Sequence, residues 1–296
     1  MKVRLHVGPH RTGTTYIQYA AFANREALAE AGVLFINKPA QCVGIPRALI
    51  ALDAEGALGM FDQLLAEARS EIAGAAKAQA VLYSSEVFFE ADPRQRPQYE
   101  AAYAKFLEGL GKRGHEVEIV FVERDLEDLL TSNALLQTSM GNLRYVGPSA
   151  TAFLEYVETY SWLKSMYFAS GGTLHLDFAA LTASGDLFAN FTKAGLGVSL
   201  ASPRSIDPSI DARNSLTDRQ VARGLLLAPI VNWLELFGSV PRFELFNAAQ
   251  PLRPPVSEAL LDEVVANVPM LRDTFRAVAR NAIDSFVKHH GVATAA

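Results

Sequence analysis

The stretch Val3–Thr15, with the sequence VRLHVGPHRTGTT, indicates the architecture expected of this chain. It begins as an apolar run of strand length, continues as a glycine-containing loop, and leads into a helix that we expect to begin at Thr14. Gly8 and Gly13 lie five positions apart, as the two glycines do in the phosphate-binding loop G-x-x-x-x-G-K-[ST]. Backbone N–H groups at such a turn, together with the positive end of the following helix, attract negative charge. The stretch therefore predicts an α/β protein whose first loop holds an anion.

This loop departs from the nucleotide-binding motif at its lysine. Thr14 stands where that lysine would follow Gly13, and the cation of the loop is Arg11, three positions earlier. The missing lysine is the group that reaches the β- and γ-phosphates of a nucleoside triphosphate. We therefore expect a phosphate-like ligand other than ATP or GTP. The alternative is a P-loop kinase or nucleotide hydrolase with a degenerate loop.

The composition of the chain argues against several classes of protein, among them nucleic-acid-binding, disulfide-rich and membrane-spanning proteins. With 296 residues, of which 50% are hydrophobic, the chain can bury a large core, and its net charge of −5 argues against a nucleic-acid partner. The single cysteine, Cys42, excludes an internal disulfide and suits a reducing compartment. The sequence shows neither a signal peptide nor the ~20 apolar residues of a membrane span. These features predict a cytoplasmic protein without a membrane span.

Apolar runs of strand length alternate with longer helical stretches along the chain. The predicted strands are Val3–Val7, Val33–Ile36, Ala80–Tyr83, Glu118–Val122 and Thr173–Leu176. The predicted helices are Thr14–Ala31, Leu58–Ala76, Tyr99–Leu110, Leu126–Gln137, Phe153–Phe168 and Asp186–Ala194, with mostly helix from Thr217 onward. This alternation predicts one α/β domain over 1–296, with a mainly parallel sheet flanked by helices and a helical C-terminal third.

The C-terminal helical stretch also bears on assembly. Apolar residues recur at helical spacing over Val256–Val287, which predicts a helix that packs on the sheet or on a second subunit. A homodimer is therefore one of the expected arrangements.

Polar side chains follow two of the predicted strands. Glu86 comes after the third strand and Ser84-Ser85, while Arg124 comes after the fourth, between Glu123 and Asp125. Ligands of open parallel sheets bind at the carboxyl ends of the strands. The sequence thus predicts an anion cradle, a carboxylate and an arginine at one edge of the sheet.

The run Pro9–Thr15, PHRTGTT, resembles the loop P-K-[ST]-G-T-[TS] of the sulfotransferases. These enzymes transfer a sulfuryl group from 3′-phosphoadenosine 5′-phosphosulfate (PAPS), without a metal. The resemblance implies that the donor is bound by Pro9, His10, Arg11, Thr12, Gly13, Thr14 and Thr15. Here His10 is additional and Arg11 replaces the family lysine. Arginine keeps the charge of that lysine but does not readily release a proton, so transition-state charge stabilisation would survive the exchange and proton donation would not.

The resemblance extends to the residues after the fourth strand. Sulfotransferases bind the 3′-phosphate with an arginine at a strand end and a serine eight residues further on, and Arg124 and Ser132 have that spacing. In the run DARNSL, Arg213 is a candidate to close over the 3′-phosphate, with an ordinary loop arginine as the other interpretation. What covers the adenine is not visible in the sequence.

Glu86 is the candidate general base. Carbohydrate-acting sulfotransferases place a glutamate near this point, many with a lysine after it, where this chain has Val87. The resemblance thus implies catalytic roles for Glu86 and Arg11, PAPS as co-substrate, no metal, and a small-molecule or saccharide acceptor with a hydroxyl or amine. A descendant that binds nucleotide without turnover is a third hypothesis.

Overall fold

The computed structural model describes residues 1–38, 41–146, 150–170, 172–200, 217–235 and 257–290. The chain divides into two compact units. The first combines Met1–Arg124 with Thr159–Asn214, and the second combines Asp125–Glu158 with Ser215–Ala296. The expectation of one domain over 1–296 stays a prediction.

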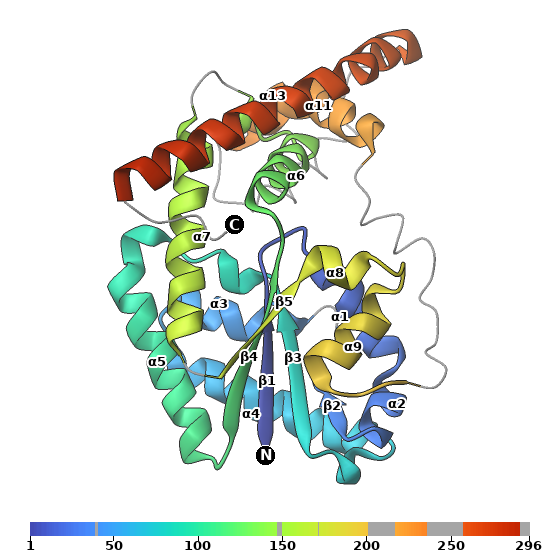
Figure 1. The fold of residues 1–296 in the computed structure, drawn as a ribbon, viewed down its shortest axis with the longest axis vertical. Coiled ribbons are helices and arrows are strands. Elements are labelled where there is room, and N and C mark those ends of the chain that lie inside the picture. The colour runs from blue at the N-terminus through green and yellow to red at the C-terminus, as the bar shows by residue number, and fades with distance from the viewer. Residues whose placement is uncertain (39–40, 147–149, 171, 201–216, 236–256, 291–296) are drawn as a thin grey trace. The chain divides into compact units, whose positions relative to one another are not determined.

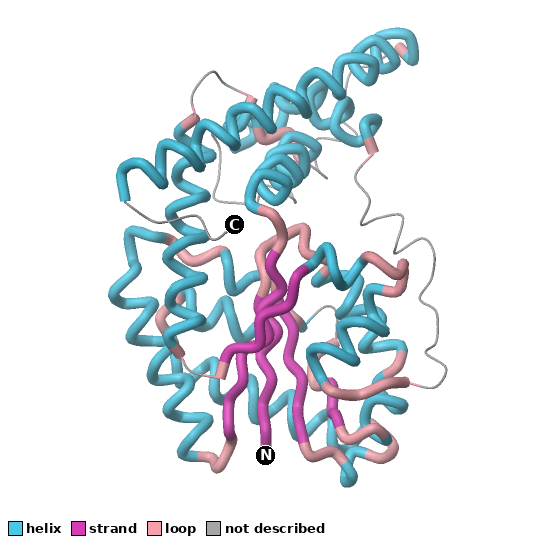
Figure 2. Tube along the Cα trace, in the orientation of Figure 1, coloured by secondary structure: helices cyan, strands magenta, loops and turns pink. Residues whose placement is uncertain are grey.

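The first unit is built on a five-stranded parallel sheet (Figures 1 and 2). Its strands are β1 (Lys2–Val7), β2 (Val33–Phe35), β3 (Ala80–Ser85), β4 (Glu116–Glu123) and β5 (Thr173–Asp177). They lie in the order β2-β3-β1-β4-β5, and each neighbouring pair is parallel. The predicted α/β class with a mainly parallel sheet is confirmed. Strands β2 and β3 lie on one side of the central β1, and the later strands β4 and β5 lie on the other. The loop after β1 therefore lies where the strand order reverses, which is where open parallel sheets bind their ligands.

Helices cover both faces of this sheet. They are α1 (Thr14–Ala23), α2 (Arg25–Glu30), α3 (Gly44–Ile50), α4 (Ala54–Glu71), α5 (Arg96–Lys112), α8 (Phe178–Thr182), α9 (Leu187–Leu196) and the later part of α7 (Thr151–Ala169). On one face, Ile17 of α1 and Phe191 of α9 pack with Val120 of β4 in a buried cluster. On the other, Phe121 of β4 contacts the ring of Phe89 at 5.7 Å. The near-continuous apolar strands follow from burial on both faces.

The first predicted helix is wrong in one respect. Instead of one helix over Thr14–Ala31, the structure has α1 and α2, separated at Asn24. The buried side chain of Asn24 donates a hydrogen bond from Nδ2 to the Ala20 carbonyl at 2.8 Å, and its backbone leaves the helical region at φ −108° and ψ 15°. Asparagine side chains compete with the backbone in this way and interrupt helices.

Two further differences concern the edges of predicted elements. Strand β3 continues past Tyr83 to Ser85, because Ser84 and Ser85 pair in register with His6 and Val7 of β1. The short helices α3 and α8 were not predicted, since five to seven residues carry too little periodicity to be recognised.

The second unit consists of helices. It contains α6 (Leu126–Ser139), the short turn η5 (Leu143–Tyr145), the first part of α7, α11 (Asp218–Glu235) and α13 (Glu258–His290). Its buried core includes Leu130 of α6, Phe153 of α7, Ala222 of α11 and Phe275 of α13. The predicted helical C-terminal segment is confirmed. No helix in the described part of the chain is long and apolar enough to cross a membrane.

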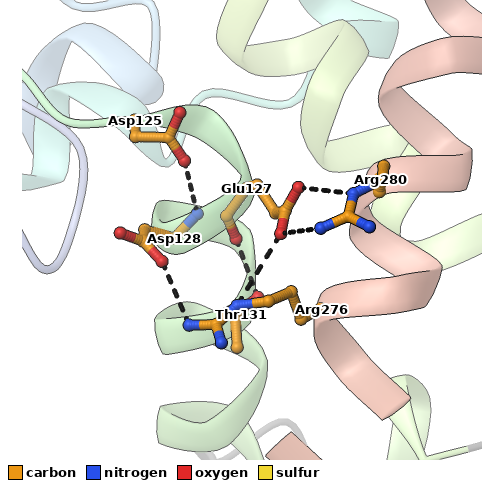
Figure 3. A network of polar contacts seen from close by, with 6 residues as sticks. All are labelled: Asp125, Glu127, Asp128, Thr131, Arg276 and Arg280. Carbon is orange, nitrogen blue, oxygen red and sulfur yellow. Dashed lines mark hydrogen bonds and ion pairs between the residues drawn. The ribbon is translucent and has the colours of Figure 1, made fainter. Parts of the chain in front are cut away.

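Acidic residues of α6 are bound by arginines of α13 (Figure 3). The Asp125 carboxylate accepts a hydrogen bond from the Asp128 backbone N–H at 2.9 Å, so Asp125 is the N-cap of α6. Glu127 accepts two hydrogen bonds from Arg280, both at 2.9 Å, and Arg276 donates to Asp128 at 3.3 Å. The negative charges also complement the positive N-terminus of α6.

Candidate anion-binding site

Two residues of the loop after β1, Arg11 and Gly13, have a left-handed backbone conformation. Gly13 has a φ of 76°, in the left-handed region, and a β-carbon built on it would lie 2.5 Å from Cδ2 of Leu187. Arg11 is also left-handed, with a φ of 73°, an uncommon conformation for a residue with a side chain. Alternation of this kind turns successive backbone N–H groups toward one side and forms an anion-binding concavity. The loop therefore has the backbone expected of an anion cradle.

The threonines hold the loop from inside. Thr12 is fully buried, and its hydroxyl donates to the Pro9 carbonyl at 2.8 Å and lies 3.2 Å from Oγ1 of Thr14. The Thr12 side chain is thus used to brace the loop. Helix α1 begins at Thr14, and its N-cap, Gly13, has no side chain with which to cap it. The first N–H groups of a helix have no partner within it, so an anion is a suitable partner here.

Arg124, directly after β4, lies against this loop. Its Nη1 donates a hydrogen bond to the Arg11 carbonyl at 3.1 Å, and its guanidinium lies 5.5 Å from the ring centre of Phe178. Burial lowers the pKa of Arg11, and repulsion by the Arg124 charge lowers it further. Arginine still keeps its proton at neutral pH. Two positive charges are therefore concentrated at one loop, a situation that a bound anion relieves.

Glu86 follows β3, the neighbour of β1. One of its carboxylate oxygens, Oε2, accepts a hydrogen bond from Nε2 of Gln18 at 2.9 Å. The same Nε2 donates to the Ser84 carbonyl at 3.1 Å, and Gln18 is only 2% exposed. The carboxylate of Glu86 is therefore fixed by a buried amide from α1, the helix that begins at the anion loop.

His10 forms a second link between the loop and the segment after β3. Its Nε2 lies 2.9 Å from Oε1 of Glu90. Burial alone would lower the pKa of His10, but the hydrogen bond to Glu90 and the charges of Glu86 and Glu90 outweigh it, so this pKa is raised from its ordinary value. His10 thus carries a positive charge more readily than an ordinary histidine.

A buried polar layer lies beneath Glu86. Asn37 donates from Nδ2 to the Ser84 carbonyl at 2.9 Å, and the Ser84 hydroxyl lies 2.8 Å from Nδ1 of His6. His6 is fully buried, and burial lowers its pKa to about 3. This layer fixes the end of β3, and with it the start of the segment that carries Glu86.

The structure brings most of the predicted site residues together in the first unit. The loop Pro9–Thr15, Glu86 and Arg124 lie at the carboxyl ends of β1, β3 and β4. Ser132 lies on α6 in the second unit, so its pairing with Arg124 stays a prediction. Arg213 lies outside the described residues.

Glu123, the last residue of β4, forms contacts with α7 and β5. Its carboxylate contacts the ammonium of Lys164 and lies 2.5 Å from Nε2 of His175, and the Tyr160 hydroxyl donates to it at 3.0 Å. Its side chain therefore takes part in a network with α7 and β5.

Sequence reasoning missed three residues of this site: Gln18, Glu90 and Phe178. A signal was present for the first, because Gln18 is a polar residue one helical turn after Thr14 on the buried side of α1. Glu90 repeats Glu86 at a spacing of four residues. Phe178 belongs to α8, which was not predicted, and its contact with Arg124 had no signal in the sequence.

Comparison of the chain with models of known protein families, with curated proteins and with solved structures finds no match. The function is therefore argued from the site itself.

Proposed function

We propose that this chain is a sulfotransferase that moves a sulfuryl group from PAPS to a hydroxyl or amine of a small-molecule or saccharide acceptor. The observation that carries the proposal is the placement of two guanidinium groups, Arg11 and Arg124, at one glycine loop, with the carboxylate of Glu86 after the neighbouring strand. The low cysteine content and negative net charge support a cytoplasmic enzyme without a nucleic-acid partner.

The loop suits the phosphosulfate end of PAPS. A cradle of backbone N–H groups and a helix N-terminus bind a phosphate-like group without any specific side chain. Arg11 would add charge where negative charge develops as the phosphate leaves, which is where catalysis gains most from a fixed cation. Arg124 would hold the 3′-phosphate, since arginine forms charge-assisted hydrogen bonds with phosphate.

Glu86 would activate the acceptor. As the acceptor oxygen or nitrogen forms its bond to sulfur, the bond between sulfur and the phosphate oxygen breaks, and the acceptor proton passes to the Glu86 carboxylate. A base works best when its orientation is fixed before the reaction, and the hydrogen bond from Gln18 fixes one of the two carboxylate oxygens. The other oxygen would then receive the proton.

The kinase alternative has weaker support. It requires a lysine after Gly13 to reach the terminal phosphates, and Thr14 occupies that position. Glu123 and Asp125 are the acids that could hold magnesium in such an enzyme. Glu123 interacts instead with Lys164 and His175, and Asp125 caps α6.

Calorimetry of 3′-phosphoadenosine 5′-phosphate (PAP) binding, without metal, tests the proposal. We expect micromolar binding that 5′-AMP does not reproduce and that weakens at least tenfold in Arg124→Ala, because a charge-assisted hydrogen bond contributes roughly 1.5–3 kcal/mol. Arg113→Ala is the matched control. Arg113 also donates from Nη1 to a backbone carbonyl at 3.1 Å, but it precedes β4 and so lies at the opposite end of that strand. Magnesium-dependent ATP binding that is unaffected by Arg124→Ala, or no binding of PAP, would overturn the proposal.

A further inference from the structure

His10 and Glu90 form a pair that the resemblance to sulfotransferases does not account for. Glu90 lies four residues after Glu86, beyond the short turn η3 (Val87–Phe89), and its carboxylate reaches back to the anion loop. The His10 side chain is 29% exposed and that of Glu90 46%, so both groups are accessible to solvent and can exchange protons with it.

The charges around His10 come from two elements. Glu86 and Glu90, from the segment after β3, favour its protonated form, and Arg11, from its own loop, opposes it. The carboxylates prevail over burial and over the Arg11 charge, so the pKa of His10 is raised from its ordinary value.

His10 belongs to the loop that the donor is expected to contact. It precedes Arg11, whose left-handed backbone shapes the cradle and whose carbonyl accepts the hydrogen bond from Arg124. A proton on the imidazole therefore adds a third positive charge to a loop that already has two, and removing it leaves Glu90 as a net negative charge beside the same loop. Both effects make the loop bind an anion more tightly when His10 is protonated than when it is neutral.

We propose that the His10–Glu90 pair is a proton-dependent part of the anion site, so that the loop binds its anionic ligand more tightly when the His10 imidazole carries a proton. The inference rests on the proposed function only in taking PAPS to be that ligand. By linkage, binding of the anion must also draw a proton onto His10 at a pH where the free protein is only partly protonated there.

PAP binding at about pH 6 and about pH 9, on either side of the range in which histidine ordinarily changes its charge, tests the linkage. The wild type is compared with His10→Gln at each pH, because the ratio of the two affinities cancels the titration of PAP itself. We expect the wild type to bind about tenfold more tightly than His10→Gln at the lower pH and about equally at the higher pH. His175→Gln is the matched control, since His175 is a second histidine paired with a glutamate, Glu123, and lies on β5 outside the loop. A ratio that does not change with pH would overturn the inference while leaving the proposed function intact.

Two further measurements keep the inference testable if PAP does not bind. In the first, inorganic pyrophosphate replaces PAP in the comparison of the wild type with His10→Gln. If the wild type binds pyrophosphate more tightly than His10→Gln at the lower pH and about equally at the higher pH, the inference is supported even though the proposed function has failed. In parallel, NMR titration of the full chain follows the His10 ring signals, assigned by their loss in His10→Gln. We expect the His10 titration midpoint to fall in Glu90→Gln and to rise when the anion is bound. An unchanged midpoint in both cases would overturn the inference.

Discussion

The side-chain amide of Gln18 donates a single hydrogen bond of 2.9 Å to the carboxylate of Glu86 while it also donates to the Ser84 carbonyl at 3.1 Å. Gln18 lies on α1, which begins at the anion loop, and Glu86 follows β3, which pairs with β1. The candidate base and the candidate donor loop are therefore positioned by one helix. In the proposed reaction this link would keep the base at a fixed distance from the sulfuryl group.

Replacing Gln18 by leucine tests this link. We expect Gln18→Leu to reduce kcat for sulfuryl transfer roughly tenfold or more and to change the Kd for PAP less than about twofold. The substitution removes the hydrogen bond that orients Glu86 but leaves the backbone of the loop unaltered. Steady-state kinetics with an accepted acceptor and calorimetry with PAP give the two values.

Asn37→Leu provides the control for Gln18→Leu. Asn37 is equally buried and donates to the same Ser84 carbonyl at 2.9 Å, but no hydrogen bond of the described residues joins it to Glu86. We expect it to lower the free energy of unfolding and to affect kcat less than Gln18→Leu does. An equal loss of kcat in both variants would mean that Gln18 acts only through the stability of the β3 end.

The requirement for glycine at position 13 can be measured against a second glycine with the same backbone. Gly13 and Gly114 both have a φ of 76°, but a β-carbon on Gly13 would lie 2.5 Å from Leu187 and 3.2 Å from Phe178, whereas one on Gly114 has no atom within 4 Å. We expect Gly114→Ala to cost about 1 kcal/mol of unfolding free energy and Gly13→Ala about 2–4 kcal/mol. Urea denaturation of both variants decides; equal costs would show that only the backbone conformation matters at position 13.

The sequence predicted the sheet, and the loop between its first strand and first helix, well because both depend on local patterns. The apolar runs and the Gly8–Gly13 spacing are contained in short segments, and the strand-end rule was enough to nominate Glu86 and Arg124. The contacts between elements were not predictable in the same way. That Gln18 reaches Glu86 depends on how α1 lies against β3, and the contact of Arg124 with Phe178 depends on a helix too short to leave a periodic signal.

His6 should make the stability of the protein depend on acid pH. Burial lowers its pKa to about 3 from an ordinary value of 6.5, so between these two values the unfolded chain binds a proton that the folded chain does not. Stability is therefore fully present above the unfolded pKa and falls as the pH drops, with a contribution from this residue of about 1.4 kcal/mol per pH unit. We expect urea denaturation of His6→Leu between about pH 4 and pH 6 to show a slope that is smaller by this amount.

The comparison for His6→Leu uses the slope and not the stability itself, because leucine also deprives the Ser84 hydroxyl of its contact with Nδ1. His289→Gln, at an exposed position on α13, is the control for replacing a histidine outside this buried layer. Equal slopes in the wild type and His6→Leu would contradict the assignment of a neutral, buried His6.

The close approach of α11 to α6 in the second unit depends on Gly224. A β-carbon there would collide with the Thr138 carbonyl oxygen and would lie 2.5 Å from backbone atoms of Ser139, so the obstruction is backbone and not a side chain that can rotate away. We expect Gly224→Ala to lower the free energy of unfolding by at least about 2 kcal/mol, although alanine is the better helix former. Gly59→Ala in α4, where a β-carbon has no atom within 4 Å, should instead stabilise by about 0.5–1 kcal/mol. Chemical denaturation of the two variants separates packing from helix propensity, since propensity alone would make both changes favourable.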